Sequence, residues 1–100
     1  MKCLCAHQYK FFDTIANRSR WNILELLATA PMNVSQIAEV LKEEQSAVSH
    51  NLKKLASCNV IKVEQIGKKR IYSLNKETIL PLMQLVEKHV GTYCKGRCTA

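Results

Sequence analysis

The spacing of apolar residues changes at Val60 in this 100-residue chain. Before that position apolar residues recur every three or four residues, which is the period of an amphipathic helix. From Val60 to Leu74 they follow a strand-like pattern on either side of Gly67-Lys68-Lys69, as in a β-hairpin. A helical period returns at Ile79. The pattern therefore predicts a mainly α fold with a small β-hairpin before the last helix.

The ends of these elements are marked by residues that begin or stop helices. Asn17 can cap the second helix, and Pro31 is expected to end it. Asn59 is a plausible left-handed C-cap of the fourth helix, and Gly91 is expected to end the fifth. We expect a single domain over residues 1–100, with helices at 6–16, between 17 and 31, at 34–42, 45–58 and 78–91, strands within 60–74, and a tail at 92–100.

The positive charge is concentrated in one part of the chain. Between His50 and Lys76 lie seven lysine or arginine residues and a single acid, Glu64, so this segment carries +6 of the net charge of +7. A basic surface attracts nucleic acid or an anionic membrane. No apolar run approaches the roughly 18 residues that span a bilayer, and no signal peptide is evident. We therefore expect a cytoplasmic protein that binds nucleic acid and no membrane.

Residues 34–58 and 60–74 together form a known DNA-binding pattern. Two helices joined by the short polar turn Lys42-Glu43-Glu44 and followed by a basic hairpin make a winged helix-turn-helix. Val48, Leu52 and Leu55 would dock the helix at 45–58 on the core, so its polar side chains would face base edges and phosphates. The predicted DNA-binding residues are Gln45, Ser46, Ser49, His50, Lys53, Lys54, Lys68, Lys69 and Arg70.

Other functions remain open at this point. A lysine-rich hairpin is often only a solvated sheet edge that resists pairing with another strand. A winged helix can also serve protein contacts or nucleic-acid packaging without sequence preference. An enzyme is not expected: the chain has no Cys-x-x-Cys of a thiol oxidoreductase and no evident catalytic set of Ser, His and Asp or paired carboxylates.

The segments Val34–Leu41 and Gln45–Leu55, followed by the hairpin at Gly67–Leu74, resemble the arsenic-repressor (ArsR/SmtB-type) family of winged-helix transcriptional regulators. The resemblance covers roughly residues 8–91. It implies a homodimeric repressor that pairs helices 6–16 and 78–91, binds an imperfect palindrome in double-stranded DNA, and is released by a metal, metalloid or redox signal. The apolar stripe Ile79–Val90 favours dimerisation independently, with packing inside one chain as the alternative.

The chain departs from the family at its best-known sensing motif. That motif places two cysteines at the start of the recognition helix, where this sequence has Lys42, Glu43 and Glu44. The glycine that is usual in this turn is absent as well. The chain cannot use that site, so any sensing residues must lie elsewhere.

Cysteines near the chain ends are the candidate sensor. The odd number of cysteines, five, argues against a disulfide framework. The dimer implied by the resemblance would bring Cys3 and Cys5 towards Cys94 and Cys98. Thiolates suit soft ions, so we predict that these four cysteines bind a thiophilic metal or metalloid such as Zn, Cd, Pb or trivalent As.

Two alternatives use the same cysteines differently. Exposed thiols near cations can form a disulfide switch or react with oxidants or reactive sulfur, and they can also have no sensory role. His7 and His89 are possible substitute ligands, although each is more simply a surface or interface residue. Cys58, at the end of the recognition helix, is expected to be a small buried apolar residue rather than a third ligand.

Overall fold

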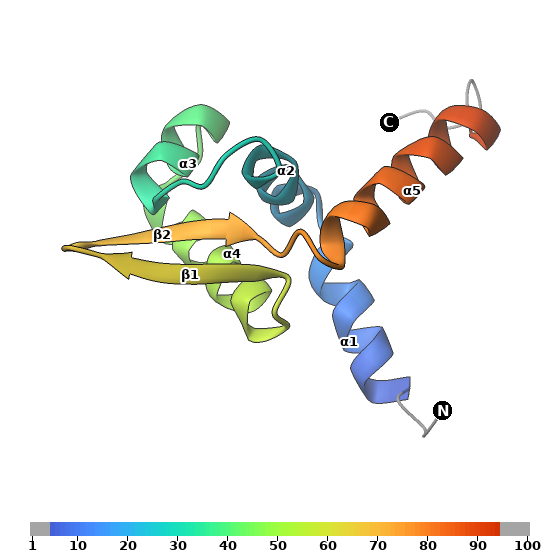
Figure 1. Ribbon diagram of the computed structural model, residues 1–100, viewed down its shortest axis with the longest axis horizontal. Coiled ribbons are helices and arrows are strands. Elements are labelled where there is room, and N and C mark those ends of the chain that lie inside the picture. Colours follow the sequence, from blue (N-terminus) through green and yellow to red (C-terminus); the bar gives the residue numbers. More distant parts are fainter. Residues whose placement is uncertain (1–4, 95–100) are drawn as a thin grey trace.

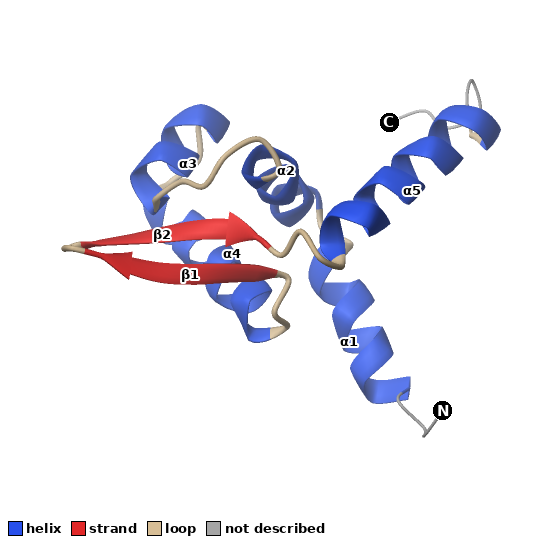
Figure 2. Cartoon of the chain, in the orientation of Figure 1, coloured by secondary structure: helices blue, strands red, loops and turns tan. Residues whose placement is uncertain are grey.

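The computed structural model describes residues 5–94, which form five helices and a two-stranded antiparallel sheet. The hairpin projects from one side of the molecule, and α1 and α5 diverge on the opposite side (Figures 1 and 2). The fold class predicted from the sequence is confirmed. The elements are α1 (Cys5–Ile15), α2 (Arg18–Leu27), α3 (Val34–Leu41), α4 (Gln45–Ser57), β1 (Ile61–Ile66), β2 (Lys69–Leu74) and α5 (Ile79–Tyr93).

The core lies where α2, α3, α4 and the base of the hairpin meet. Each of these elements contributes apolar side chains that are less than 2% exposed. Removing one such side chain from water stabilises the fold by about 1.5–3 kcal/mol. The largest fully buried side chains are Ile23, Leu24, Leu27, Ile37, Val48, Leu52, Leu55, Val60 and Ile61.

Two asparagines begin helices in the way their side chains allow. The Asn17 side chain accepts a hydrogen bond from the backbone N–H of Arg20 at 3.1 Å, which confirms the predicted cap of α2. At α3, Asn33 accepts from the N–H of Gln36, and the Gln36 side chain accepts from the N–H of Asn33, both at 2.9 Å. This reciprocal capping box fixes the first turn of α3.

The hairpin places alternate residues on its two faces. Strand pairing runs from Ile61 opposite Leu74 to Ile66 opposite Lys69, and Gly67 makes the turn with a φ of 63°. Every second residue of a strand lies on the same face, so Arg70 and Tyr72 of β2 share a face with the buried Leu74. The inner face of the hairpin therefore runs from the core to the basic tip.

A second pairing joins the hairpin to the segment before α3. Met32 donates to the carbonyl of Tyr72 at 3.0 Å, and Tyr72 donates to the carbonyl of Met32 at 2.8 Å. The N-terminus of α3 is thereby held against β2.

Two helix ends differ from the prediction. Helix α5 continues through Gly91 to Tyr93, so the expected end at residue 91 was wrong. Gly91 does not adopt the left-handed conformation of a glycine cap, and its exposed position lets it remain helical. Helix α2 ends at Leu27, before Pro31, where the N–H and the hydroxyl of Thr29 both donate to the Leu26 carbonyl and close a tighter turn. The other predicted helix ends agree within one residue.

After α4 the left-handed conformation predicted for Asn59 is confirmed, but the C-cap is Cys58 and not Asn59. Asn59 has a φ of 57°, the left-handed conformation expected for it, and it follows the C-cap residue Cys58. The side-chain amide of Asn75 donates to the Asn59 carbonyl at 2.9 Å. This bond joins the end of α4 to the end of the hairpin. No helix among residues 5–94 is long and apolar enough to cross a membrane.

Candidate nucleic-acid interface

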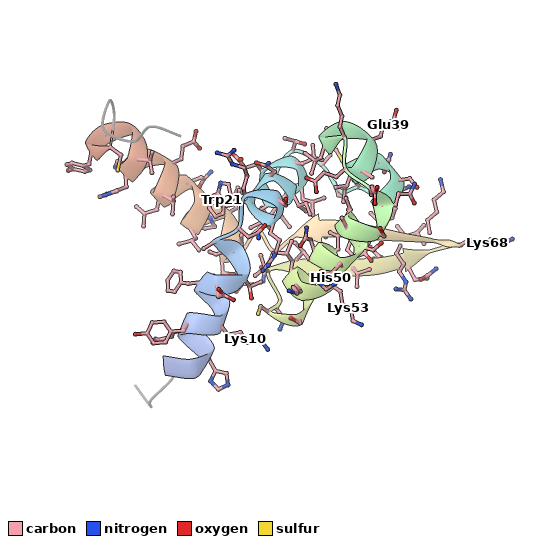
Figure 3. The ribbon with its side chains drawn as sticks, turned by 180° about the vertical axis from the view of Figure 1, so that it is seen from behind. Lys10, Trp21, Glu39, His50, Lys53 and Lys68 are labelled. Carbon is pink, nitrogen blue, oxygen red and sulfur yellow. The ribbon has the colours of Figure 1, made fainter. Side chains whose placement is uncertain are left out.

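Helix α4 has one buried face and one polar, solvent-exposed face. Val48, Leu52 and Leu55 are fully buried, as predicted, and they fix the rotation of the helix about its axis. Figure 3 shows His50 and Lys53 pointing away from the body of the molecule. The six predicted DNA-binding residues of this helix are all exposed: Gln45, Ser46, Ser49, His50, Lys53 and Lys54.

The hairpin tip carries the other three predicted residues. Lys68, Lys69 and Arg70 are exposed around the turn, and Lys68 lies at the end of the hairpin farthest from the core (Figure 3). On α4 and the hairpin tip, none of the predicted cationic contacts forms an ion pair with an acidic side chain within residues 5–94. These contacts are Lys53, Lys54, Lys68, Lys69 and Arg70. Their charges are therefore not neutralised within this part of the chain and are available to an anionic partner.

The structure brings part of α4 and part of the hairpin to one groove. Ser49, Lys69 and Arg70 line an open groove of about 420 Å³ together with residues that the sequence did not suggest. The additional residues are Asn33, Val34 and Ser35 at the start of α3 and Tyr72 in β2. The Met32–Tyr72 pairing joins the segment before α3 to β2, two elements that line this groove, and no local sequence signal predicts it.

Large apolar side chains are exposed on α1 and α5, on the opposite side of the molecule, and Val40, Val63 and Ile66 are exposed on α3 and the hairpin as well. Tyr9 of α1 is 75% exposed, and Leu85 and Tyr93 of α5 are 64% and 68% exposed. Phe12 and Val86 also line an apolar groove of about 480 Å³ between α1, α2 and α5. The two helices predicted to form a dimer thus present large apolar side chains to solvent.

The predicted cysteine site falls mostly outside the described part of the chain. Cys3 and Cys98 lie outside residues 5–94, and Cys5 is described only as the first residue of α1. Cys94 is half-buried at the C-terminal end of α5. Within residues 5–94, no group of three or more His, Cys, Asp or Glu residues is arranged to hold a metal ion.

The remaining candidate ligands have separate surroundings. His7 is exposed on α1, and His89 is exposed on α5, with its ring 5.0 Å from the ring of Tyr93. Cys58 is half-buried rather than fully buried, and its Sγ lies 3.6 Å from Oγ1 of the buried Thr14. Cys58 packs against the hydrophobic core, in keeping with the structural role expected for it.

Two helices joined by a short turn and followed by a hairpin define this chain as a winged helix-turn-helix protein. Residues 17–63 match the family described as "Bacterial regulatory protein, arsR family". The match covers α2, α3 and α4 and the start of β1, which include the helix-turn-helix. The chain therefore belongs to the arsR family of bacterial regulatory proteins.

Individual relatives agree with this assignment. The chain is 32% identical over 81 residues to a "Transcriptional repressor SmtB homolog" from Synechocystis sp. and 35% identical over 71 residues to the "HTH-type transcriptional regulator NmtR" from Mycobacterium tuberculosis. These alignments cover 81% and 71% of this chain. They cover 61% and 59% of the relatives, so the chain spans about three fifths of their length.

A solved structure supports the fold. The homodimeric winged helix-turn-helix DNA-binding domain Mb0332 from Mycobacterium bovis superposes with a TM-score of 0.83, at 22% identity. The comparison covers 100% of this chain and 95% of that domain. The expectation that the chain is a regulator and not an enzyme agrees with the descriptions of these relatives.

Proposed function

We propose that this chain is a homodimeric transcriptional repressor that binds double-stranded DNA with α4 and the hairpin. The observation that carries the proposal is the outer face of α4, which is polar, exposed and held in a fixed rotation by three fully buried side chains. An α-helix of this kind fits the major groove of B-DNA. The basic hairpin tip extends beyond it as the wing, which we define as residues 60–74.

The residues divide into two groups by their chemistry. Gln45, Ser46, Ser49 and His50 near the start of α4 carry groups that can donate to or accept from base edges. The lysines and the arginine neutralise phosphates, which supplies affinity that depends on salt but not on sequence. The second group consists of Lys53, Lys54, Lys68, Lys69 and Arg70.

The apolar side chains of α1 and α5 support a dimer. Large exposed apolar surfaces on a small domain mark an interaction site, and a second copy would cover the same residues on both chains. A two-fold dimer presents two copies of α4, about one helical turn of DNA apart. The proposed operator is therefore an imperfect palindrome.

The proposed signal is a thiophilic metal or metalloid, such as Zn, Cd, Pb or trivalent As, bound by Cys3, Cys5, Cys94 and Cys98. Four thiolates fit such ions by their chemistry. The start of α1 and the end of α5 lie far apart within one protomer (Figure 1), so one ion would take ligands from both chains of the dimer. Because α1 and α5 form the proposed interface, binding there would alter the spacing of the two α4 helices.

A redox or reactive-sulfur signal at the same cysteines is the second candidate. Cys94 follows Tyr93, the last residue of α5, and Cys98 is four residues further along the sequence. A disulfide needs Cα atoms within about 7 Å of each other, a distance that two cysteines four residues apart can reach. Counting thiols before and after DNA release distinguishes an oxidised protein from a metal-bound one.

The proposal is tested with the full chain and a random pool of DNA duplexes. We expect repeated selection to enrich a two-fold related sequence, and we expect dimer binding to weaken as salt rises. Salt-dependent binding with no enriched sequence would contradict the repressor and favour nucleic-acid packaging. Zn, Cd, Pb, arsenite, an oxidant and a persulfide are then added in turn. If none changes the affinity, the sensor is refuted while DNA binding stands.

A further inference from the structure

Helix α1 has a buried face and an exposed face. Thr14 and Ile15 on the buried face are each 7% exposed, and α1 contacts both α2 and α4. Tyr9 and Phe12 are exposed, and the start of the helix extends away from the rest of the protomer (Figure 1). A buried polar side chain such as that of Thr14 ordinarily finds hydrogen-bond partners. Its partners therefore show what holds α1 in place.

The hydroxyl of Thr14 joins α1 to the end of α4. Its Oγ1 lies 2.7 Å from the carbonyl oxygen of Lys10 and 3.6 Å from Sγ of Cys58, the C-cap residue of α4. A carbonyl oxygen can only accept, so the single hydroxyl proton of Thr14 is donated to Lys10. The thiol of Cys58 is therefore the donor in the contact between the two helices, and Thr14 is the acceptor.

Arg20 of α2 holds the same turn of α1. Its Nη1 donates to the carbonyl of Thr14 at 2.8 Å. The last carbonyls of a helix lack partners within the helix, and a cation beside them is favoured by the helix dipole. Thr14 is thus bonded to α2 through its backbone and to α4 through its side chain. A shift of the last turn of α1 would break one of these contacts.

A separate set of hydrogen bonds joins the end of α4 to α5. Asn75 donates from its side-chain amide to the carbonyl of Asn59 at 2.9 Å and from its backbone to the carbonyl of Val60 at 3.1 Å. The N–H of Ile79, at the start of α5, donates to the carbonyl of Asn75 at 3.0 Å. The end of α4 therefore has one link to α1 and another to α5, and each can be removed without the other.

We propose that the contact between Thr14 and Cys58 couples α1 to the recognition helix α4, so that a change at the exposed face of α1 alters the DNA affinity of α4. Thr14 acts as a positioning residue, through the end of α4. This inference rests on the proposed function, in which α1 belongs to the dimer interface. It names the residue through which a signal at that interface reaches α4.

The coupling is measured from the DNA side, because coupling between two sites is reciprocal. The probe is the 30-base-pair duplex that selection enriches, and the readout is amide hydrogen exchange of the full chain with and without it. The protein concentration is one at which sedimentation shows a dimer in both samples. In the unsubstituted chain we expect DNA to slow exchange in residues 11–15 about 3- to 10-fold, the effect of about one hydrogen bond.

Three variants separate the link to α1 from general changes at the end of α4. Thr14→Val keeps the shape of the side chain and removes the hydroxyl, so the slowing by DNA should be lost. Thr14→Ser keeps a hydroxyl and should keep the slowing. Asn75→Ala breaks the side-chain bond to Asn59 and leaves the contact of Thr14 with Cys58, so residues 11–15 should still respond. Binding of the duplex is measured for every variant in the same samples.

The contrary outcomes are distinct. If DNA binds the unsubstituted chain without slowing residues 11–15, the two helices are not coupled, and the proposed function stands. Equal slowing in Thr14→Val would show that α1 responds by another route, such as direct contact with DNA. Loss in Thr14→Ser or in Asn75→Ala would show that general packing, and not the hydroxyl, carries the response. Each of these results would overturn the inference.

Two further measurements complete the test. Exchange of the core amides of α2 and α4 without DNA should be the same in Thr14→Val and in the unsubstituted chain, which establishes that the variant is folded. If selection enriches no duplex, the proposed function fails and this inference fails with it.

Discussion

Met32 and Tyr72 pair through two backbone hydrogen bonds, which attach the segment before α3 to the wing. The pairing has a consequence for DNA binding, because α3 packs on α4 and the wing carries the basic tip. A hairpin without this attachment would be free to move relative to the helix-turn-helix. With it, the phosphate contacts of the wing and the base contacts of α4 are presented in one fixed arrangement.

Replacing Lys42 by glycine should stabilise the protein. Lys42 ends α3 in the left-handed conformation, with a φ of 55° and a ψ of 44°, where a side chain causes strain that glycine avoids. We expect Lys42→Gly to raise the free energy of unfolding by about 0.5–1 kcal/mol after the entropic cost of glycine is included. Thermal unfolding at a fixed protein concentration measures the change. Lys42→Ala removes the same charge and keeps the strain, so an equal gain from that variant would contradict the explanation.

His50→Ala should impair recognition of sequence, whereas Lys68→Ala should weaken binding to every duplex alike. His50 lies on the outer face of α4, and Lys68 lies at the tip of the wing (Figure 3). Loss of a base contact costs about 1–3 kcal/mol on the selected operator and little on random DNA. Loss of a phosphate contact reduces the salt slope by about 1. Competition between selected and random duplexes separates the two effects, and uniform weakening by His50→Ala would remove it from the base-reading set.

A glutamate at Val86 should convert the dimer to a monomer. Val86 is an exposed apolar residue of α5 that also lines the groove against α1 and α2, and a charge buried in an interface is strongly unfavourable. Gln84→Glu adds the same group two residues earlier, about 200° around the helix, and should leave the dimer intact. Sedimentation measures the mass, and circular dichroism checks that α5 remains folded. Equal dissociation by both variants would place the interface elsewhere.

Replacing Cys94 and Cys98 together by serine should abolish release from DNA while leaving DNA affinity unchanged. These residues lie beyond the DNA-binding elements, so their substitution removes thiol ligands without altering α4 or the wing. Cys58→Ser is the matched control, because Cys58 packs on the core at the end of α4 and is not assigned to the sensor. Titration with the effector in the presence of labelled operator gives the result. Release that persists in the double variant would refute the sensor at the chain ends.

Local patterns were sufficient to predict most of the fold and the outward residues of α4. The buried residues Val48, Leu52 and Leu55 recur at helical spacing, so the rotation of α4 follows from the sequence alone. The side-chain cap at Asn17 and the left-handed Asn59 were predictable for the same reason, because each depends on a few neighbouring residues. The continuation of α5 through Gly91 was missed, since glycine permits a helix end without requiring one.

The sequence by itself determined the class of fold, the family and the face of α4 that is exposed, because all three are written in the spacing of nearby residues. Only the tertiary structure decided that Met32 pairs with Tyr72 and that the start of α3 joins Arg70 and Tyr72 in one groove. It also decided that the start of α1 and the end of α5 lie far apart within one protomer (Figure 1). These relationships join residues distant in the chain, and they result from packing of the whole core rather than from any local pattern.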